Sequence, residues 1–100
     1  MLTITDIKKY IDPIVKKYSV EKVILFGSYA RGDANESSDV DLVVDSAGKL
    51  HNRKIFALGG ELLTVFPVRV DVYDILELNE LSPLYKSMIN EGVVIYETAR

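Results

Sequence analysis

The amino-acid sequence predicts an α/β (α+β) fold with about four strands. Two observations predict this class. Short runs rich in β-branched and aromatic residues stand at 22–26, 39–44, 68–73 and 93–96, as is typical of strands. Several of the segments between and before them carry apolar residues at three- and four-residue spacing, which is typical of amphipathic helices. Strands and helices that alternate in this way indicate one small mixed sheet covered by helices.

Length and composition indicate a single folded domain, which we place at 1–100. The 100 residues are 48% hydrophobic and 27% charged, which are ordinary values for a globular protein. The net charge is −3. Because proteins that grip a nucleic-acid backbone normally carry a basic surplus, this charge disfavours nucleic acid as the direct substrate. A small phosphorylated ligand fits the composition better.

Two absences in the sequence bear on the protein's surroundings. The chain has no cysteine, which excludes disulfides and thiolate metal sites and is typical of a reducing compartment. Its first residues lack the pattern of a signal peptide, and no apolar run approaches the roughly 20 residues of a membrane span. We therefore expect a cytoplasmic protein with no membrane partner.

Three longer helices are expected, over about 4–18, 52–66 and 83–91. The second of them contains the pair Gly59-Gly60. Two glycines inside a helix cost roughly 2 kcal/mol relative to alanines. The pair therefore indicates close packing against a neighbour, or a kink.

The chain is organised around the stretch 23–45, where a strand ends at Gly27 and Ser28 begins a short helix. A residue without Cβ allows backbone to approach a ligand closely. The start of a helix presents unpaired N–H groups to an anion. The sequence therefore predicts a phosphate cradle at Gly27 and Ser28.

Asp39 and Asp41 open the next predicted strand. Side chains alternate along a strand, so both carboxylates point to one side, opposite Val40 and Leu42. Two ionised carboxylates about 5 Å apart repel by roughly 3 kcal/mol at an effective dielectric constant near 20. A divalent cation reverses the sign of that interaction, and oxygen ligands of this kind suit Mg²⁺. The pair therefore predicts a metal site.

Asp71 lies in the middle of the predicted strand 68–73, on the side that also carries Arg69. An acid in an otherwise apolar strand is costly unless it is paired. An ion pair with Arg69 is one explanation. The other, which we favour, is that Asp71 joins Asp39 and Asp41 as a third carboxylate on the same cation site.

At these residues the sequence resembles a known family. Gly27-Ser28, ten intervening residues and then Asp39-Val40-Asp41 reproduce the GS-x10-DxD signature of the DNA polymerase beta nucleotidyltransferase superfamily. The stretch FGSYARGDANESSDVDLVV and the later VDV are similar to the minimal nucleotidyltransferases, or MNT-type domains. The resemblance implies a nucleotidyltransferase fold with about four strands in a small mixed sheet and helices mainly on one face.

The resemblance also implies a role for each site residue. Gly27 and Ser28 would hold the triphosphate of ATP, Asp39 and Asp41 would coordinate two Mg²⁺ ions, with Mn²⁺ as a substitute, and Asp71 would complete the second metal site and help to activate the acceptor hydroxyl. The reaction would be attack on the α-phosphate of ATP, with transfer of AMP and release of pyrophosphate. Arg31 would neutralise phosphate charge, although a surface ion pair with Asp33 or Glu36 explains Arg31 equally well.

The MNT-type domains are often paired with HEPN-domain toxins. The resemblance therefore implies that this chain is an antitoxin that adenylylates a tyrosine of a HEPN partner, as part of a homo- or hetero-oligomer. Two alternatives stay open: an antitoxin that masks its toxin without catalysis, and the catalytic subunit of a small-molecule nucleotidyltransferase. Retention of all five Gly-Ser and Asp residues favours an enzyme.

Overall fold

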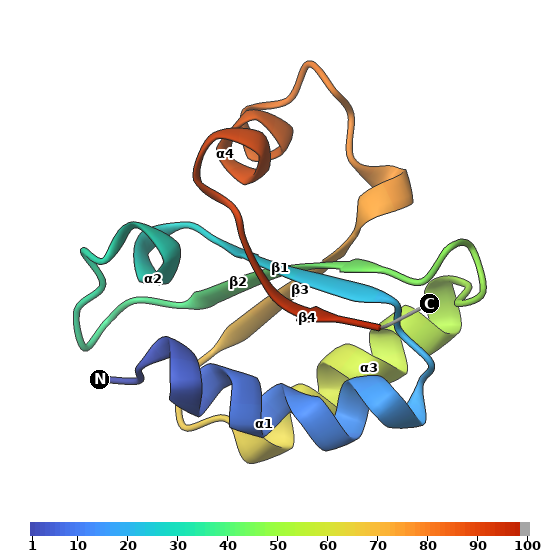
Figure 1. Ribbon diagram of the computed structural model, residues 1–100, viewed down its shortest axis with the longest axis horizontal. Helices are drawn as coiled ribbons and strands as arrows, with labels where there is room; N and C mark the ends of the chain where they lie inside the picture. Colours follow the sequence, from blue (N-terminus) through green and yellow to red (C-terminus); the bar gives the residue numbers. More distant parts are fainter. Residues whose placement is uncertain (99–100) are drawn as a thin grey trace.

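In the computed structural model, which describes residues 1–98, four strands form one sheet in the order β3-β2-β1-β4 (Figure 1). β1 runs antiparallel to both β2 and β4, and β2 runs parallel to β3. The sheet is therefore mixed, as predicted. The elements are, in chain order, α1 (Ile4–Lys17), β1 (Lys22–Phe26), α2 (Ser28–Arg31), β2 (Val40–Asp45), α3 (Asn52–Val65), β3 (Val70–Asp74), a 3-10 turn (Ile75–Glu77), α4 (Pro83–Glu91) and β4 (Val93–Glu97).

Two strand boundaries differ from the prediction. β2 begins at Val40, so Asp39 lies immediately before the strand, and β3 covers Val70–Asp74 where 68–73 was predicted. The later start of β3 follows from the connection between α3 and β3. Pro67 keeps the chain in a bend after the helix, and the first hydrogen bond between the two strands runs from Val40 N to Arg69 O at 2.9 Å.

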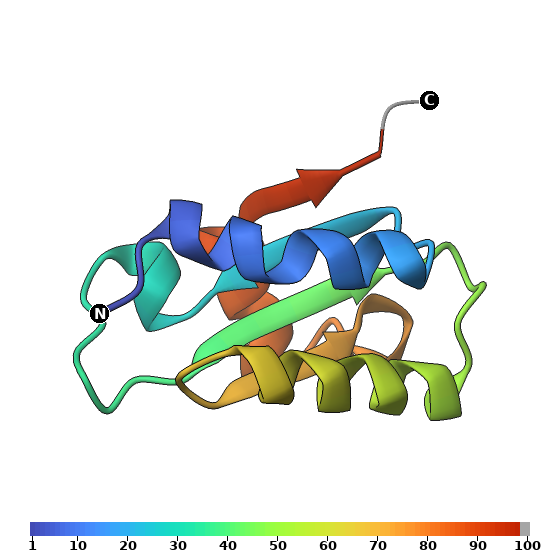
Figure 2. The same cartoon turned by 90° about the horizontal axis from the view of Figure 1, so that it is seen from below.

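The helices cover the two faces of the sheet unequally. Figure 2 shows α1 and α3 side by side over one face, where they bury the main core with strand residues such as Val23, Leu25 and Leu42. α4 lies on the opposite face (Figure 1) and packs Met88 against Phe26 and Val43. The prediction of helices mainly on one face is therefore confirmed for the two long helices, and α4 is the exception.

The alternation of side chains along the strands assigns the acids to the α4 face. Val40 and Leu42 belong to the core beneath α1 and α3, whereas Val43 belongs to the cluster beneath α4. Asp41 shares its side of β2 with Val43. No helix within residues 1–98 has the length and apolar character needed to cross a bilayer.

The glycine pair in α3 does not have the packing role that we expected. The helix continues through both residues. A Cβ added to Gly59 would make ordinary contacts with Val72 at 3.8 and 3.9 Å, and a Cβ added to Gly60 would meet no atom within 4 Å. Close packing therefore does not explain why this helix carries two residues of low helix propensity.

Candidate functional site

Gly27 joins β1 to α2 in a conformation that excludes other residues. Its φ is 77° and its ψ is −156°, a combination that is essentially restricted to glycine. A Cβ built at this position would lie 2.5 Å from Oδ2 of Asp41. Gly27 therefore lies directly against the Asp41 carboxylate on β2. This follows from the strand register, in which Asp41 is the partner of Phe26, the last residue of β1.

The turn leaves hydrogen-bonding groups of Ser28 available to a ligand. α2 has four residues; Gly27 O accepts hydrogen bonds from the amides of Ala30 and Arg31, and the left-handed Gly32 ends the helix. Within residues 1–98 the structure gives the Ser28 hydroxyl no hydrogen-bond partner. The buried Tyr29 anchors the turn to the core. The predicted cradle is thus a single anchored turn, and it adjoins the acids.

The sheet brings two of the three predicted acids into direct register. Asp41 on β2 and Asp71 on β3 are partners across the parallel pair, and Asp39 lies exposed just before β2. Burial first, and then the negative charges of Asp71 and Asp39, raise the pKa of the Asp41 carboxyl to about 6, against the opposing effect of Arg31. The three carboxylates therefore act on one another electrostatically.

The arrangement is not a preassembled metal cage. Within residues 1–98, no three His, Cys, Asp or Glu side chains are grouped closely enough to hold a metal ion together. Asp71 Oδ1 instead accepts a hydrogen bond from Arg69 Nε at 3.1 Å. The residues nevertheless fit a hard divalent cation by their chemistry, because all the donors are carboxylate oxygens and their negative charge exceeds what one arginine offsets. Binding would require Asp71 to turn from Arg69.

The ion pair between Arg69 and Asp71 is the alternative that the sequence left open, and it is present. The Arg69 side chain is 70% exposed, so solvent screens the pair and it contributes little to stability. The pKa of Arg69 is raised first by its hydrogen bond to Asp71 and then by the charges of Asp71 and Asp39. The pair and a metal-binding role for Asp71 are compatible, since a weak surface pair exchanges easily.

Arg31 is paired with two carboxylates outside the predicted set of acids, although its charge still acts on Asp41. It contacts Asp33 at 3.1 Å, as one alternative predicted, and both oxygens of Glu91 at 3.1 Å. Glu91 is the last residue of α4 and lies 60 positions away in the chain, so only the tertiary structure reveals this contact. Glu36, the other predicted partner, makes no hydrogen bond or ion pair with Arg31 within residues 1–98.

Tyr73 lies near the acids, and our interpretation of the sequence placed it on the same side of the strand as Asp71 but did not include it among the site residues. Burial, and then the charges of Asp71 and Asp41, raise the pKa of its hydroxyl, and its ring packs against Phe26 with centroids 5.9 Å apart. The alternation of Arg69, Asp71 and Tyr73 along one side of the strand is the signal that points to Tyr73.

The raised pKa of Asp41 predicts how stability depends on pH in the absence of metal. The folded chain holds the Asp41 proton with a pKa of about 6, against an ordinary 3.8. Protonation therefore stabilises the folded state, and the unfavourable contribution of Asp41 is lost as the pH falls from above 6 toward 3.8. We expect a higher melting temperature at about pH 5 than at about pH 7.5, and a smaller difference in Asp41→Asn. Equal pH responses of the two proteins would contradict this.

Comparison with known proteins adds two sequence matches. A family model described as "Polymerase beta, Nucleotidyltransferase" matches residues 8–100. The chain is also 38% identical over 93 residues to a protein of Methanocaldococcus jannaschii that is provisionally named a protein adenylyltransferase. That alignment covers 92% of this chain and 97% of the relative.

Two of the solved structures that share the fold are toxin-antitoxin complexes. One, a toxin-antitoxin complex with AMP-PNP, contains a chain that matches with a TM-score of 0.78 at 24% identity, over 91% of this chain and 73% of that one. The other contains a tri-AMPylated HEPN toxin of Shewanella oneidensis in complex with an MNT antitoxin, and matches with a TM-score of 0.73 at 20% identity, over 96% and 74% of the two chains. At these identities the likeness concerns the fold, and it confirms the predicted architecture.

Proposed function

Because the chain belongs to the polymerase beta nucleotidyltransferase family, we propose that it transfers AMP from ATP to a tyrosine hydroxyl of a HEPN-type toxin and so acts as an antitoxin. The observation that carries the proposal is the close approach of Gly27 to Asp41. Gly27 lies so close to Asp41 that no Cβ fits between them, and Asp71 is in register with Asp41. A phosphate at this turn would therefore lie beside both carboxylates.

The nucleotide would be held by the turn and by one arginine. The Ser28 hydroxyl and the backbone of the turn would donate hydrogen bonds to the triphosphate. Arg31 follows one helical turn later and would exchange its surface carboxylates, Asp33 and Glu91, for phosphate oxygens. Loss of the pair with Asp33 has a low cost, because the Arg31 and Asp33 side chains are 45% and 62% exposed and solvent screens the pair. Glu91 is 21% exposed, so solvent screens its pair with Arg31 less.

The acids would bind two divalent ions with the nucleotide, Asp39 and Asp41 holding both and Asp71 completing one site. When bound, such ions polarise the α-phosphate and offset charge on the attacking and leaving oxygens. Asp71 lies at the outer strand, where it would accept the proton of the tyrosine hydroxyl. The tyrosine oxygen then bonds to the α-phosphorus, and the bond from that phosphorus to the bridging oxygen breaks and releases pyrophosphate.

We expect ATP to bind only in the presence of Mg²⁺ or Mn²⁺. Without a cation, the negative charges of Asp39, Asp41 and Asp71 repel the triphosphate across a partly buried site. Isothermal titration calorimetry with Mg²⁺ and with EDTA measures the effect. Equal ATP affinity in the two buffers would remove the three acids from the binding site.

The test of the proposed function is incubation of the chain with ATP, Mg²⁺ and the neighbouring gene product as the candidate partner, followed by intact mass measurement. We expect the partner to gain one or more AMP masses. The gain should be absent with Asp39→Asn and retained with Asp12→Asn, a control acid on α1 whose carboxylate pairs with Lys16 at 2.9 Å. A partner that is inhibited but unmodified would instead identify a masking antitoxin, and modification with Asp39→Asn would overturn the site.

A further inference from the structure

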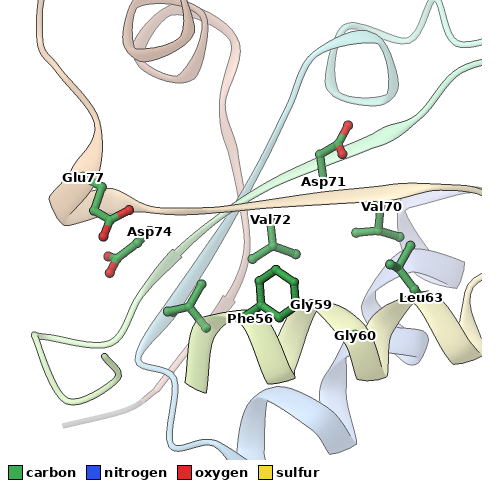
Figure 3. Close-up of a pocket in the computed structure, with 10 residues that line it drawn as sticks. Phe56, Gly59, Gly60, Leu63, Val70, Asp71, Val72, Asp74 and Glu77 are labelled. Atoms are coloured by element: carbon green, nitrogen blue, oxygen red, sulfur yellow. The ribbon is translucent and has the colours of Figure 1, made fainter. Parts of the chain in front are cut away.

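A groove separates α3 from the outer edge of β3 (Figure 3). It encloses about 390 Å³ and is lined largely by apolar side chains of Phe56, Leu63, Val70 and Val72. Phe56 is 85% exposed and Leu63 is 52% exposed. Side chains of this size at such exposure, gathered along one groove, mark a surface that a partner can cover.

The edge of β3 offers unpaired backbone groups to that partner. β3 is the outermost strand of the sheet, and Val40 N on β2 donates to Arg69 O. In a parallel pair, the N–H and C=O of one residue point to the same neighbour, so Arg69, Asp71 and Tyr73 bond to β2. Val70, Val72 and Asp74 therefore direct their N–H and C=O groups out of the sheet, as a template for an added strand.

The glycine pair of α3 keeps the groove open. Gly59 and Gly60 both line it, and neither is required by packing, since a Cβ at Gly60 would meet nothing within 4 Å. The pair lowers the helix propensity of α3 without improving a contact inside the chain. Space for the side chains of a bound segment accounts for both glycines.

The groove is also continuous with the candidate active site. Figure 3 shows the carboxylate of Asp71 pointing away from α3 while Val70 and Val72 face it. A strand added beside β3 would alternate in the same way, with every second side chain in the groove and the intervening ones on the side of Asp71. The polar residues that line the groove, Asp71, Asp74 and Glu77, are all acidic, which favours a basic occupant.

We propose that the groove between α3 and the edge of β3 binds an extended, apolar and basic segment of the partner protein as a fifth strand, and that this segment carries its acceptor hydroxyl to Asp71. The proposal rests on the proposed function for the identity of the reaction. It assigns to β3 the task of positioning the acceptor. Apolar residues of the segment fill the groove over Gly60, and a Lys or Arg lies near Glu77.

The experiment uses a synthetic peptide as probe, with alternating valine and threonine, one central tyrosine and a lysine at each end. Its control is the same peptide N-methylated along its centre, which cannot donate strand hydrogen bonds. Amide chemical shifts of the ¹⁵N-labelled chain report the contact. We expect the plain peptide to shift the amides of Val70, Val72, Asp74 and Gly60, and the methylated peptide to bind at least about tenfold more weakly.

Matched variants of α3 separate a role in binding from a role in folding. Gly60→Leu fills the groove and should raise the melting temperature, since leucine favours helix, yet it should weaken peptide binding and AMP transfer to the partner about tenfold. Ala57→Leu, on the same helix but outside the groove, should leave peptide binding and AMP transfer unchanged. Mg-ATP affinity should be the same in all three proteins.

Four outcomes would overturn the proposal: no amide shifts along β3, shifts along β4 in their place, equal binding of the plain and methylated peptides, or undiminished AMP transfer by Gly60→Leu. A wild-type dimer in sedimentation that Gly60→Leu abolishes would show that a second copy of this chain fills the groove. Failure of wild type to bind Mg-ATP would instead refute the proposed function. The peptide titration would still test whether the groove binds an added strand.

Discussion

Asp41→Asn should abolish AMP transfer and yet leave the metal-free protein at least as stable as wild type. Asp41→Asn keeps the shape of the side chain and removes a partly buried negative charge. Burial, and then repulsion by Asp71 and Asp39, raise the pKa of this carboxyl to about 6. Within residues 1–98 the structure gives the Asp41 carboxylate no hydrogen bond or ion pair that the substitution would lose. The melting temperature should therefore rise by a few degrees, since about 1 kcal/mol moves a domain of this size by roughly 4 to 8 °C.

The nucleotide response separates this expectation from a purely structural role. Wild type should gain stability from Mg-ATP, by about 2.7 kcal/mol at a hundredfold excess over the dissociation constant, and Asp41→Asn should gain little. Asp45→Asn is the matched control at the other end of β2, where Asp45 Oδ1 accepts a hydrogen bond from the Ala47 amide; it should respond like wild type. An Asp41→Asn protein that melts lower and still responds to Mg-ATP would refute the metal-site assignment.

Gly27→Ala should have the largest structural effect of any single methyl addition in the site. Two costs combine. The backbone conformation, with φ at 77° and ψ at −156°, costs of the order of 1 to 3 kcal/mol for a residue with Cβ, or between about 4 and 24 °C of melting temperature. The added Cβ would also lie 2.5 Å from Asp41 Oδ2 and would displace this carboxylate. Nucleotide binding and transfer should both be lost.

Gly48→Ala is the control for Gly27→Ala. Gly48 also has a positive φ, of 78°, but a Cβ there would meet only Leu76 Cδ1 at 3.9 Å. It should therefore lose stability without losing activity. A double-mutant cycle followed by thermal melts separates the effect of the contact between the added Cβ and Asp41 from that of the backbone. Gly27→Ala should lower the melting temperature less in an Asp41→Ala background than in wild type. Equal costs in the two backgrounds would show that Gly27 is needed for its backbone conformation alone.

The sequence by itself determined the features of the site that depend on local geometry. The alternation of side chains assigned Asp41 and Asp71 each to the polar side of a strand, and Gly27 with Ser28 marked the turn between β1 and α2. These predictions depend on the periods of helices and strands, which act over a few residues. The same patterns indicated the number of strands and the long helices, although β2 and β3 begin one and two residues later than predicted.

Only the tertiary structure decided how these local pieces meet. The parallel register of β2 and β3 places Asp41 beside Asp71, and it depends on the crossover through α3, which no short pattern specifies. The contact of Arg31 with Glu91 spans 60 residues.

The glycines show most clearly what the sequence alone cannot determine. From sequence, Gly27 indicated space for a ligand and Gly59-Gly60 indicated close packing; in the fold, Gly27 faces the Asp41 carboxylate and Gly60 faces open space. The neighbour of a missing side chain comes from a distant segment, so the sequence around a glycine cannot identify it.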